Sequence, residues 1–173
     1  MKGSLFALVV AGSILAVPTA SAQETAHPFG LTFGTSLAGM KKLIPGLTAT
    51  EATNTYVATS VPTPYPGFES YGFFISSAHG LCRVVAIGAT IEDDRYGTET
   101  RADFRALQEA LTTKYGEPFV VDSLIAETYL KGPEYWAMNL SDNARVFAAV
   151  WPKGDGPLGF GLNAIELAAK GLS

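Results

Sequence analysis

The clearest pattern of apolar and polar positions lies between Thr98 and Pro118. Apolar residues recur there at intervals of three and four, which places them on one stripe of an α-helix: Phe104, Leu107, Leu111 and Tyr115. Charged and amide side chains fall on the rest of the surface. Thr98 or Thr100 is a suitable N-terminal cap, Gly116 a suitable C-terminal cap, and Pro118 prevents continuation. The pattern predicts an amphipathic helix, and we expect its stripe to pack on a sheet that contains Val84 to Ile91.

Two strand patterns precede this helix. Tyr71 to Ile75 alternates large apolar residues on one face, and Leu81 to Ile91 is almost continuously apolar, as is typical of a central strand. Ser77 to Gly80 supplies the turn between them. We therefore predict a hairpin whose aromatic side chains, including Phe73 and Phe74, are mostly buried.

The remaining patterns are shorter. Thr35 or Ser36 is placed to cap a short helix that carries Leu37, Met40 and Leu43 or Ile44 inward. Alternation predicts three short strands, Thr55–Thr59, Phe119–Val121 and Ala126–Leu130, and a hairpin of Tyr135–Leu140 with Arg145–Trp151. A turn is predicted over KGDGPLG. The chain then ends in a predicted strand, Phe160–Leu167, for which a helix over Ile165–Leu172 is the alternative. The order indicates an α+β fold with an antiparallel sheet packed against two helices; two α-then-β units are one interpretation of it.

The first residues match a secretory signal peptide. Lys2 gives a positive start, Leu5 to Val17 form an apolar core, and Ala20-Ser21-Ala22 is a small-x-small cleavage signal. We predict that residues 1–22 are removed between Ala22 and Gln23, and that residues 23–173 form a single secreted or periplasmic domain. The apolar run is shorter than the roughly 20 residues of a membrane span, and the rest of the sequence contains no apolar run of that length. We therefore expect no transmembrane span in the mature chain.

The net charge limits the kinds of partner that the protein can bind, and the cysteine content limits how its fold is stabilised. The chain has a formal net charge of −4, which becomes −5 when Lys2 is removed with the leader. A mildly acidic protein without runs of basic residues is a poor candidate for binding nucleic acid or anionic membranes. Cys82 is the only cysteine. The fold must therefore be stabilised by packing and hydrogen bonds, without a disulfide within the chain.

Three stretches carry family resemblances. The strand GLCRVVAIGATI, the Tyr96-Gly97 turn and the helix end TTKYGEP together resemble a pattern found in uncharacterised exported bacterial proteins. The segment FGTSLAGMKKLIPG resembles the opening helix of the BamE/SmpA family of small outer-membrane assembly proteins, and the α-then-β order is similar to that family and to the β-lactamase inhibitor proteins. These resemblances imply an exported α-then-β architecture, and they assign no functional residue to this chain.

His79 and Cys82 are the first candidates for chemistry. They stand three residues apart at the predicted hairpin turn, where an imidazole and a thiolate could act as base and nucleophile or as two metal ligands. Either role needs further groups that the neighbouring sequence does not supply. We expect Cys82 to be a structural residue, buried beside Val84 and Ala86.

The densest acidic cluster is Glu92, Asp93 and Asp94. Three consecutive acids point in different directions, and the alternating pattern of a calcium loop is absent, so we predict no metal and no cofactor. The favoured interpretation is a solvated turn that places negative charge near the start of the following helix. Signatures of a serine nucleophile elbow, a phosphate-binding loop and a zinc protease are also missing from the sequence.

The proline-rich stretch VPTPYPGFES offers Tyr65 and Phe68 as exposed aromatic contacts for a partner. Trp136 and Trp151 would face each other across the second predicted hairpin, in core packing. We favour a non-enzymatic module that binds an envelope protein or peptide through a sheet face or edge. Two alternatives stay open: a small hydrolase or metal-dependent enzyme using His79, Cys82 or residues 92–94, and a carrier of an apolar small molecule between helix and sheet.

Overall fold

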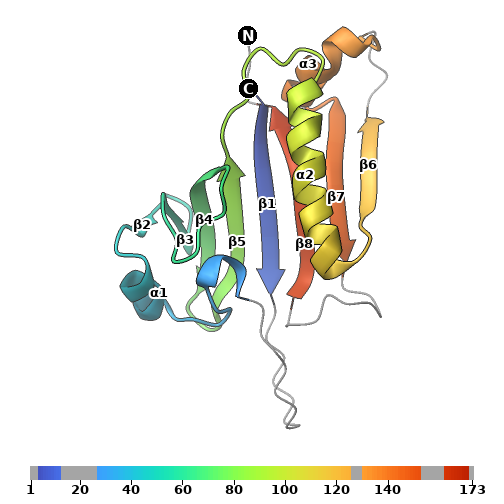
Figure 1. Cartoon of the computed structure of the whole chain (residues 1–173). Coiled ribbons are helices and arrows are strands. Elements are labelled where there is room, and N and C mark those ends of the chain that lie inside the picture. The colour runs from blue at the N-terminus through green and yellow to red at the C-terminus, as the bar shows by residue number, and fades with distance from the viewer. Residues whose placement is uncertain (1–3, 13–26, 126–129, 153–161, 172–173) are drawn as a thin grey trace. The chain divides into compact units, whose positions relative to one another are not determined.

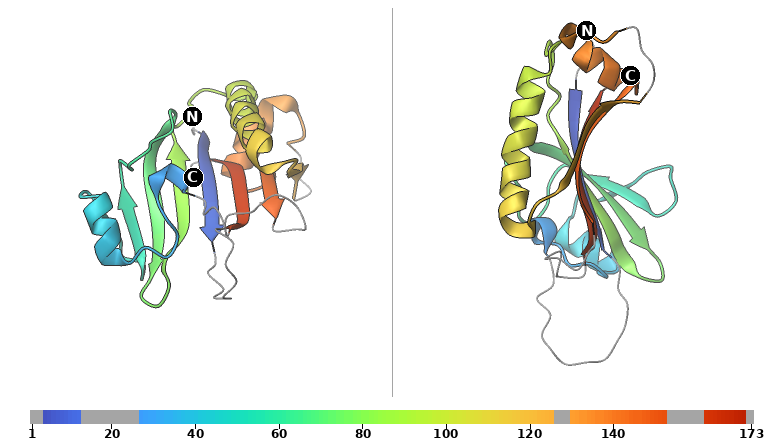
Figure 2. Two further views of the ribbon diagram at one scale, coloured as in Figure 1. Left: turned by 60° about the horizontal axis from the view of Figure 1, so that its bottom comes forward. Right: turned by 90° about the vertical axis from the view of Figure 1, so that its right-hand side faces the viewer.

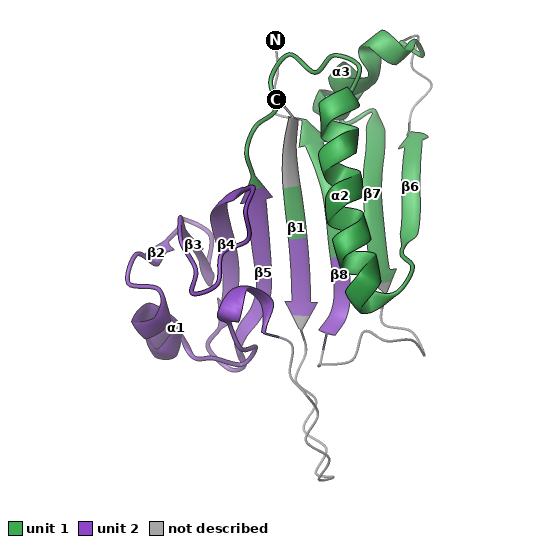
Figure 3. Ribbon diagram, in the orientation of Figure 1, with its two compact units in different colours: residues 1–8, 88–151, 166–173 green, residues 9–87, 152–165 purple. Residues whose placement is uncertain are grey.

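The computed structural model has a mixed α+β fold, as predicted (Figure 1). It describes residues 4–12, 27–125, 130–152 and 162–171. Eight strands form a sheet in the order β2-β3-β4-β5-β1-β8-β7-β6, and the pairs β2/β3, β3/β4 and β6/β7 are antiparallel. The described residues contain three α-helices, one more than the sequence pattern predicted. The chain divides into two compact units: residues 1–8, 88–151 and 166–173 form unit 1, and residues 9–87 and 152–165 form unit 2 (Figure 3).

Unit 2 begins with a 3-10 turn, Pro28–Gly30, and a short helix α1, Leu37–Leu43, followed by strands β2, Thr48–Ala49, and β3, Thr55–Ala58. The predicted cap of α1 is confirmed at Ser36, whose Oγ accepts a hydrogen bond from the Gly39 amide at 3.2 Å. Met40 and Ile44 are buried, whereas Leu43 is 48 % exposed. Of the two alternatives for the inward position, Ile44 is therefore correct.

The hairpin of unit 2 consists of β4, Phe68–Ser76, and β5, Gly80–Gly88. The predicted alternation is confirmed, because Tyr71, Phe73 and Ile75 are each 3 % exposed or less. The expectation for Phe74 was wrong: it points to the other face and is 41 % exposed. Consecutive strand residues alternate between faces, so Phe73 and Phe74 could not both be buried unless both faces of β4 were covered.

Unit 1 contains α2, Thr98–Tyr115, which lies along one face of the sheet over β7, Arg145–Pro152, with β6, Phe119–Leu124, beside β7 (Figures 1 and 2). The predicted stripe faces the sheet, but only Phe104 is fully buried. Its ring centroid lies 4.1 Å from that of Phe147 on β7. We had expected the helix to pack on a sheet that contains Val84 to Ile91; the sheet does include β5, but the strand that Phe104 contacts is β7. At the other end, Trp151 Nε1 donates to the Gly116 carbonyl at 2.7 Å and ties the end of α2 to β7.

The start of α2 is capped differently from the prediction. Gly97 occupies the N-cap position with a φ of 67°, and no side chain at that position makes a cap bond. Instead, the Asp94 carboxylate accepts from the amides of Thr98 at 2.7 Å and Thr100 at 2.8 Å. Neither threonine is the cap. At the C-terminal end, Gly116 has the predicted positive φ, 80°, with an extended ψ of −170°.

The second predicted hairpin is wrong. A 3-10 turn, Pro133–Tyr135, leads into helix α3, Trp136–Ser141, so the segment predicted as strand Tyr135–Leu140 is helical. A short apolar run fits both periodicities, and alanine, methionine and leucine favour the helix. Trp136 and Trp151 consequently do not face each other as a strand pair. The Trp136 ring instead meets Phe147 edge to face, with centroids 5.4 Å apart.

The two ends of the described chain are both strands. β8, Leu162–Gly171, confirms the predicted final strand and makes the rival C-terminal helix wrong. Residues Ser4–Gly12, which belong to the predicted leader, form β1 in the full chain, with Leu8 and Val10 buried. The proposed cleavage site, most of the strand Ala126–Leu130 and the KGDGPLG turn lie outside the described residues.

Candidate binding surface

Strand β6 presents the most exposed apolar surface of unit 1. It is the last strand in the sheet order, so one side of its backbone has no neighbouring strand among the residues that the structure describes. Phe119 is 68 % exposed and Val120 45 %, and Ile125 directly after the strand is 64 % exposed. Phe119 and Val120 are consecutive and therefore point to opposite faces. The strand is open to solvent on both faces as well as along its outer edge.

The charge on β6 is already paired. Asp122 is the only ionisable residue between Phe119 and Leu124, and it forms a salt bridge with Arg145, which lies diagonally across from it on β7 and pairs directly with Leu124. Edge strands that stay unpaired are usually guarded by lysine, proline or other free charges. Between Phe119 and Leu124 there is no lysine or proline, although Pro118 directly precedes the strand, and the single charge is neutralised within the sheet. The edge is chemically suited to accept another strand.

The predicted contacts Tyr65 and Phe68 lie together in unit 2. Their ring centroids are 5.9 Å apart, and Phe68 also meets Phe29 edge to face at 5.9 Å. Tyr65 is 45 % exposed, whereas Phe68 opens β4 and is half-buried. Phe29 in turn meets the buried Tyr71 at 5.2 Å. The pair is thus the outer part of an aromatic cluster that continues into the core, and Tyr65 is its accessible member.

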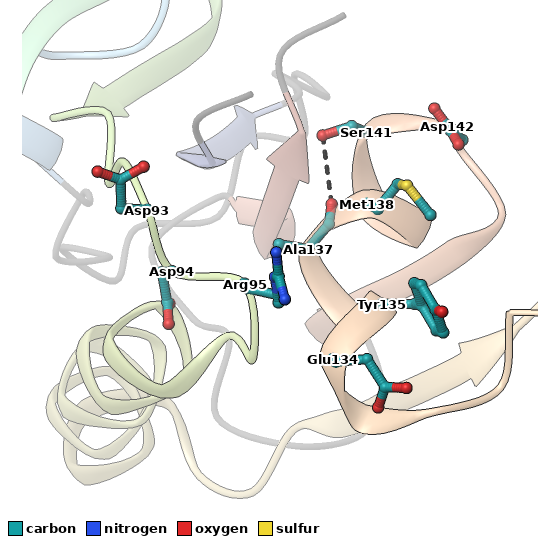
Figure 4. A pocket seen from close by; sticks show the side chains of 9 residues that line it. All are labelled: Asp93, Asp94, Arg95, Glu134, Tyr135, Ala137, Met138, Ser141 and Asp142. Carbon is teal, nitrogen blue, oxygen red and sulfur yellow. Dashed lines mark hydrogen bonds between the residues drawn. The ribbon is translucent and has the colours of Figure 1, made fainter. Parts of the chain in front are cut away.

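A cavity of about 600 Å³ in unit 1 lies beside α3 and is lined by several charged side chains (Figure 4). Two segments line it, the loop before α2 and the 3-10 turn with α3: Asp93, Asp94, Arg95, Glu134, Tyr135, Ala137, Met138, Ser141 and Asp142. The Ala137 amide donates to the Arg95 carbonyl at 3.2 Å and joins the two segments. The Ser141 hydroxyl donates to the Ala137 carbonyl at 3.2 Å, so it is engaged by its own helix. No histidine or cysteine lines this cavity to activate it.

Within the acidic cluster, Asp94 has a structural role. Burial disfavours its charged form, but hydrogen bonds from the Thr100 and Thr98 amides outweigh that effect and lower the pKa of the carboxyl. This confirms that the cluster places negative charge at the start of α2. Glu92 and Asp93 are exposed. Among the described residues, no group of three histidine, cysteine, aspartate or glutamate side chains is arranged to hold a metal ion.

His79 and Cys82 form no constellation with a third group in the part of the chain that the structure describes. His79 is exposed in the turn between β4 and β5. Cys82 is half-buried, and its Sγ donates to the Gly80 carbonyl at 3.2 Å. The expectation that Cys82 would be buried with Val84 and Ala86 was therefore wrong in degree, since only those two are fully buried. The structure supplies neither an orienting group nor further ligands for the enzymatic alternative.

The edge of β6 is the feature that sequence reasoning missed. The apolar triplet Phe119 to Val121 predicted a short strand, but no local signal shows that this strand ends the sheet.

In the described segments, no helix combines the length and apolarity needed to cross a membrane. Comparisons of the chain with protein-family models, with curated proteins and with solved structures found no match.

Proposed function

We propose that this protein is an exported, non-enzymatic module that binds an extended segment of an envelope protein by adding it as a strand beside β6. The observation that carries the proposal is the unguarded edge, with Phe119 68 % exposed and Val120 45 % exposed. An added strand would pair with the free backbone groups of β6, and the two side chains would contact it from opposite faces. Affinity then comes from the backbone and selectivity from the apolar neighbours.

Photo-crosslinking in the native cell tests this proposal. Val120 is replaced by a photoreactive phenylalanine analogue, and the same analogue at the exposed Glu109 on α2 serves as the control. We expect a discrete adduct with another envelope protein from position 120 and none from position 109. Equal adducts from both positions would contradict the proposal. Adducts only with a second copy of this chain would show that the edge serves self-association.

A second pair of variants separates binding from folding. Phe119→Lys and Val120→Lys place on the edge the charge that guards other edge strands. Both positions are exposed, so stability should change by no more than about 0.5 kcal/mol. In each variant the photoreactive analogue is placed at Ile125, which directly follows the strand and is 64 % exposed. We expect this position to form an adduct with the partner in the otherwise unchanged protein and none in either lysine variant. Persistence of that adduct at unchanged stability would show that β6 does not bind the partner.

Export is the other half of the proposal and is supported by the sequence of residues 1–22. In the full chain, part of this leader forms β1, Ser4–Gly12, so the precursor and the mature protein would differ by one strand of the sheet. Intact-mass measurement on protein recovered from the periplasm or the medium tests the point. A mass that begins at Gln23 supports export with cleavage, and a cytosolic protein that retains residues 1–22 contradicts it.

We also infer that the element order reflects two α-then-β units. The support is that α1 precedes β2 to β5, and α2 precedes β6 to β8. In this interpretation, α3 is an insertion in the second unit.

A further inference from the structure

A second cavity, of about 700 Å³, lies entirely in unit 2. It is bounded by α1, the start of β3, the end of β4 and the turn before β5. Its volume falls within the roughly 300–1,000 Å³ of small-molecule sites. Segments that are distant in sequence thus converge on one concave site beside β3 and β4.

The cavity has one aromatic wall and a buried apolar residue. Tyr56 pairs directly with Phe73 in the β3–β4 register, so its ring lies on the same face as the buried Phe73. Ile75, 3 % exposed, also lines the cavity, and its amide donates to the Asn54 carbonyl at 2.9 Å. That bond holds the Asn54 backbone, which has a positive φ of 61°, at the start of β3. The aromatic ring and the amide are therefore set on ordered backbone.

Two polar side chains of the lining are engaged, because Ser36 Oγ accepts from the Gly39 amide and Ser76 Oγ from the Ala78 amide, but four others are uncommitted. In the described parts of the chain, the side chains of Asn54, Tyr56, Ser77 and His79 make no hydrogen bond to another residue. Together they offer an amide, a phenol, a hydroxyl and an imidazole, each able to donate and to accept. No aspartate, glutamate, lysine or arginine lines the cavity. The site is rich in neutral hydrogen-bonding groups and poor in charge.

We propose that this cavity binds a neutral saccharide. The apolar C–H face of a sugar ring can pack on the aromatic ring of Tyr56. The hydroxyls of the sugar both donate and accept hydrogen bonds, as the four polar side chains do. A phosphate or carboxylate ligand would need a cation in the wall, and an amine would need a carboxylate. Neither is present in the lining. A neutral polyhydroxylated ligand is the class whose chemistry matches the four uncommitted polar side chains and the Tyr56 ring.

Titration followed by NMR tests the inference. Isotope-labelled protein is titrated with maltotriose, cellotriose and chitotriose, and with glucose 6-phosphate as a charged counterpart. We expect at least one trisaccharide to cause saturable shifts of the amides of residues 54–56 and 76–80. Absence of saturable shifts with all three, or shifts that map elsewhere, would overturn the proposal. Tighter binding of glucose 6-phosphate than of any trisaccharide would also overturn it.

Matched variants assign the contacts. Asn54→Gly removes the amide and keeps the positive φ, and Asn143→Gly, also at a positive φ of 54° but outside the cavity, is its control. We expect Asn54→Gly to weaken binding roughly threefold to tenfold, as for one lost hydrogen bond, and Asn143→Gly to leave it unchanged. Tyr56→Phe removes only the phenol and should likewise weaken binding roughly threefold to tenfold, whereas Tyr56→Leu also removes the aromatic surface and should weaken binding further. Equal affinities for the two glycine variants, or for the two Tyr56 variants, would refute these contacts.

Discussion

The packing of α2 on β7 can be measured by comparing two truncations on the same helix stripe, Phe104→Ala and Leu111→Ala. Phe104 is 1 % exposed, and its ring lies 4.1 Å from that of Phe147. Leu111 is on the same stripe but only half-buried. The helix pattern treats the two positions alike, so the difference between them comes from the structure alone.

The expected magnitudes follow from burial. Truncating a fully buried phenylalanine costs about 3–5 kcal/mol, and the aromatic pair adds roughly 0.5–1.5 kcal/mol that area alone does not supply. A fully buried leucine costs about 2–5 kcal/mol, but Leu111 keeps part of its side chain in water in the folded state. We therefore expect about 1–2 kcal/mol for Leu111→Ala and at least about 3 kcal/mol for Phe104→Ala.

Urea denaturation followed by circular dichroism measures both values. The midpoint should fall for each variant at an unchanged slope, which would show that the surface exposed on unfolding is the same. A Phe104→Leu/Phe147→Leu double-mutant cycle should return a coupling of about 0.5–1.5 kcal/mol. The account is refuted if Leu111→Ala costs as much as Phe104→Ala, or if the cycle shows no coupling.

Two further predictions concern the entry to α2. Asp94→Ala removes the cap and should cost about 0.5–2 kcal/mol at neutral pH. Because folding lowers the Asp94 pKa, its contribution is complete above the unfolded value of about 3.9 and is lost as the pH falls through the folded pKa. The stability gap in urea titrations should close in acid, and a gap that widens there would be contrary evidence. Gly97→Ala should be far more damaging than Gly46→Ala in thermal melts: a Cβ at Gly97, where φ is 67°, would overlap the Trp136 ring, while a Cβ at Gly46 would meet no other residue within 4 Å apart from its chain neighbours. Equal melting temperatures would show that Gly97 is not constrained.

Local patterns predicted the elements whose burial is decided by their own alternation. The stripe of α2, the alternation in β4 and the Ser36 cap of α1 are all confirmed, because each depends on residues a few positions apart. The sheet expected to pack against α2 does contain β5, but the strand in contact with Phe104 was predicted wrongly. Adjacency in sequence favoured the preceding hairpin, whereas Phe104 packs on Phe147, 43 positions later. Contacts of that range are set by topology, which no short pattern encodes.

The candidate surfaces were less predictable than the fold. The exposure of Phe119 follows from the place of β6 at the end of the sheet order, and the same apolar triplet in a central strand would be buried. The unit 2 cavity joins Asn54 and Tyr56 with His79, which share no sequence motif. His79 was singled out for a different chemistry, together with Cys82. Sites of both kinds arise where segments meet, so they become visible only when the fold is known.

The division of the tryptophans and the cysteine between the two units has a practical consequence for spectroscopy. Both tryptophans of the chain belong to unit 1, and its only cysteine belongs to unit 2. Selectively excited tryptophan fluorescence therefore reports on unit 1, while a fluorophore attached to Cys82 reports on unit 2. Native sequence thus supplies two independent optical probes, and coincidence of their transitions would show that both units unfold as one cooperative structure.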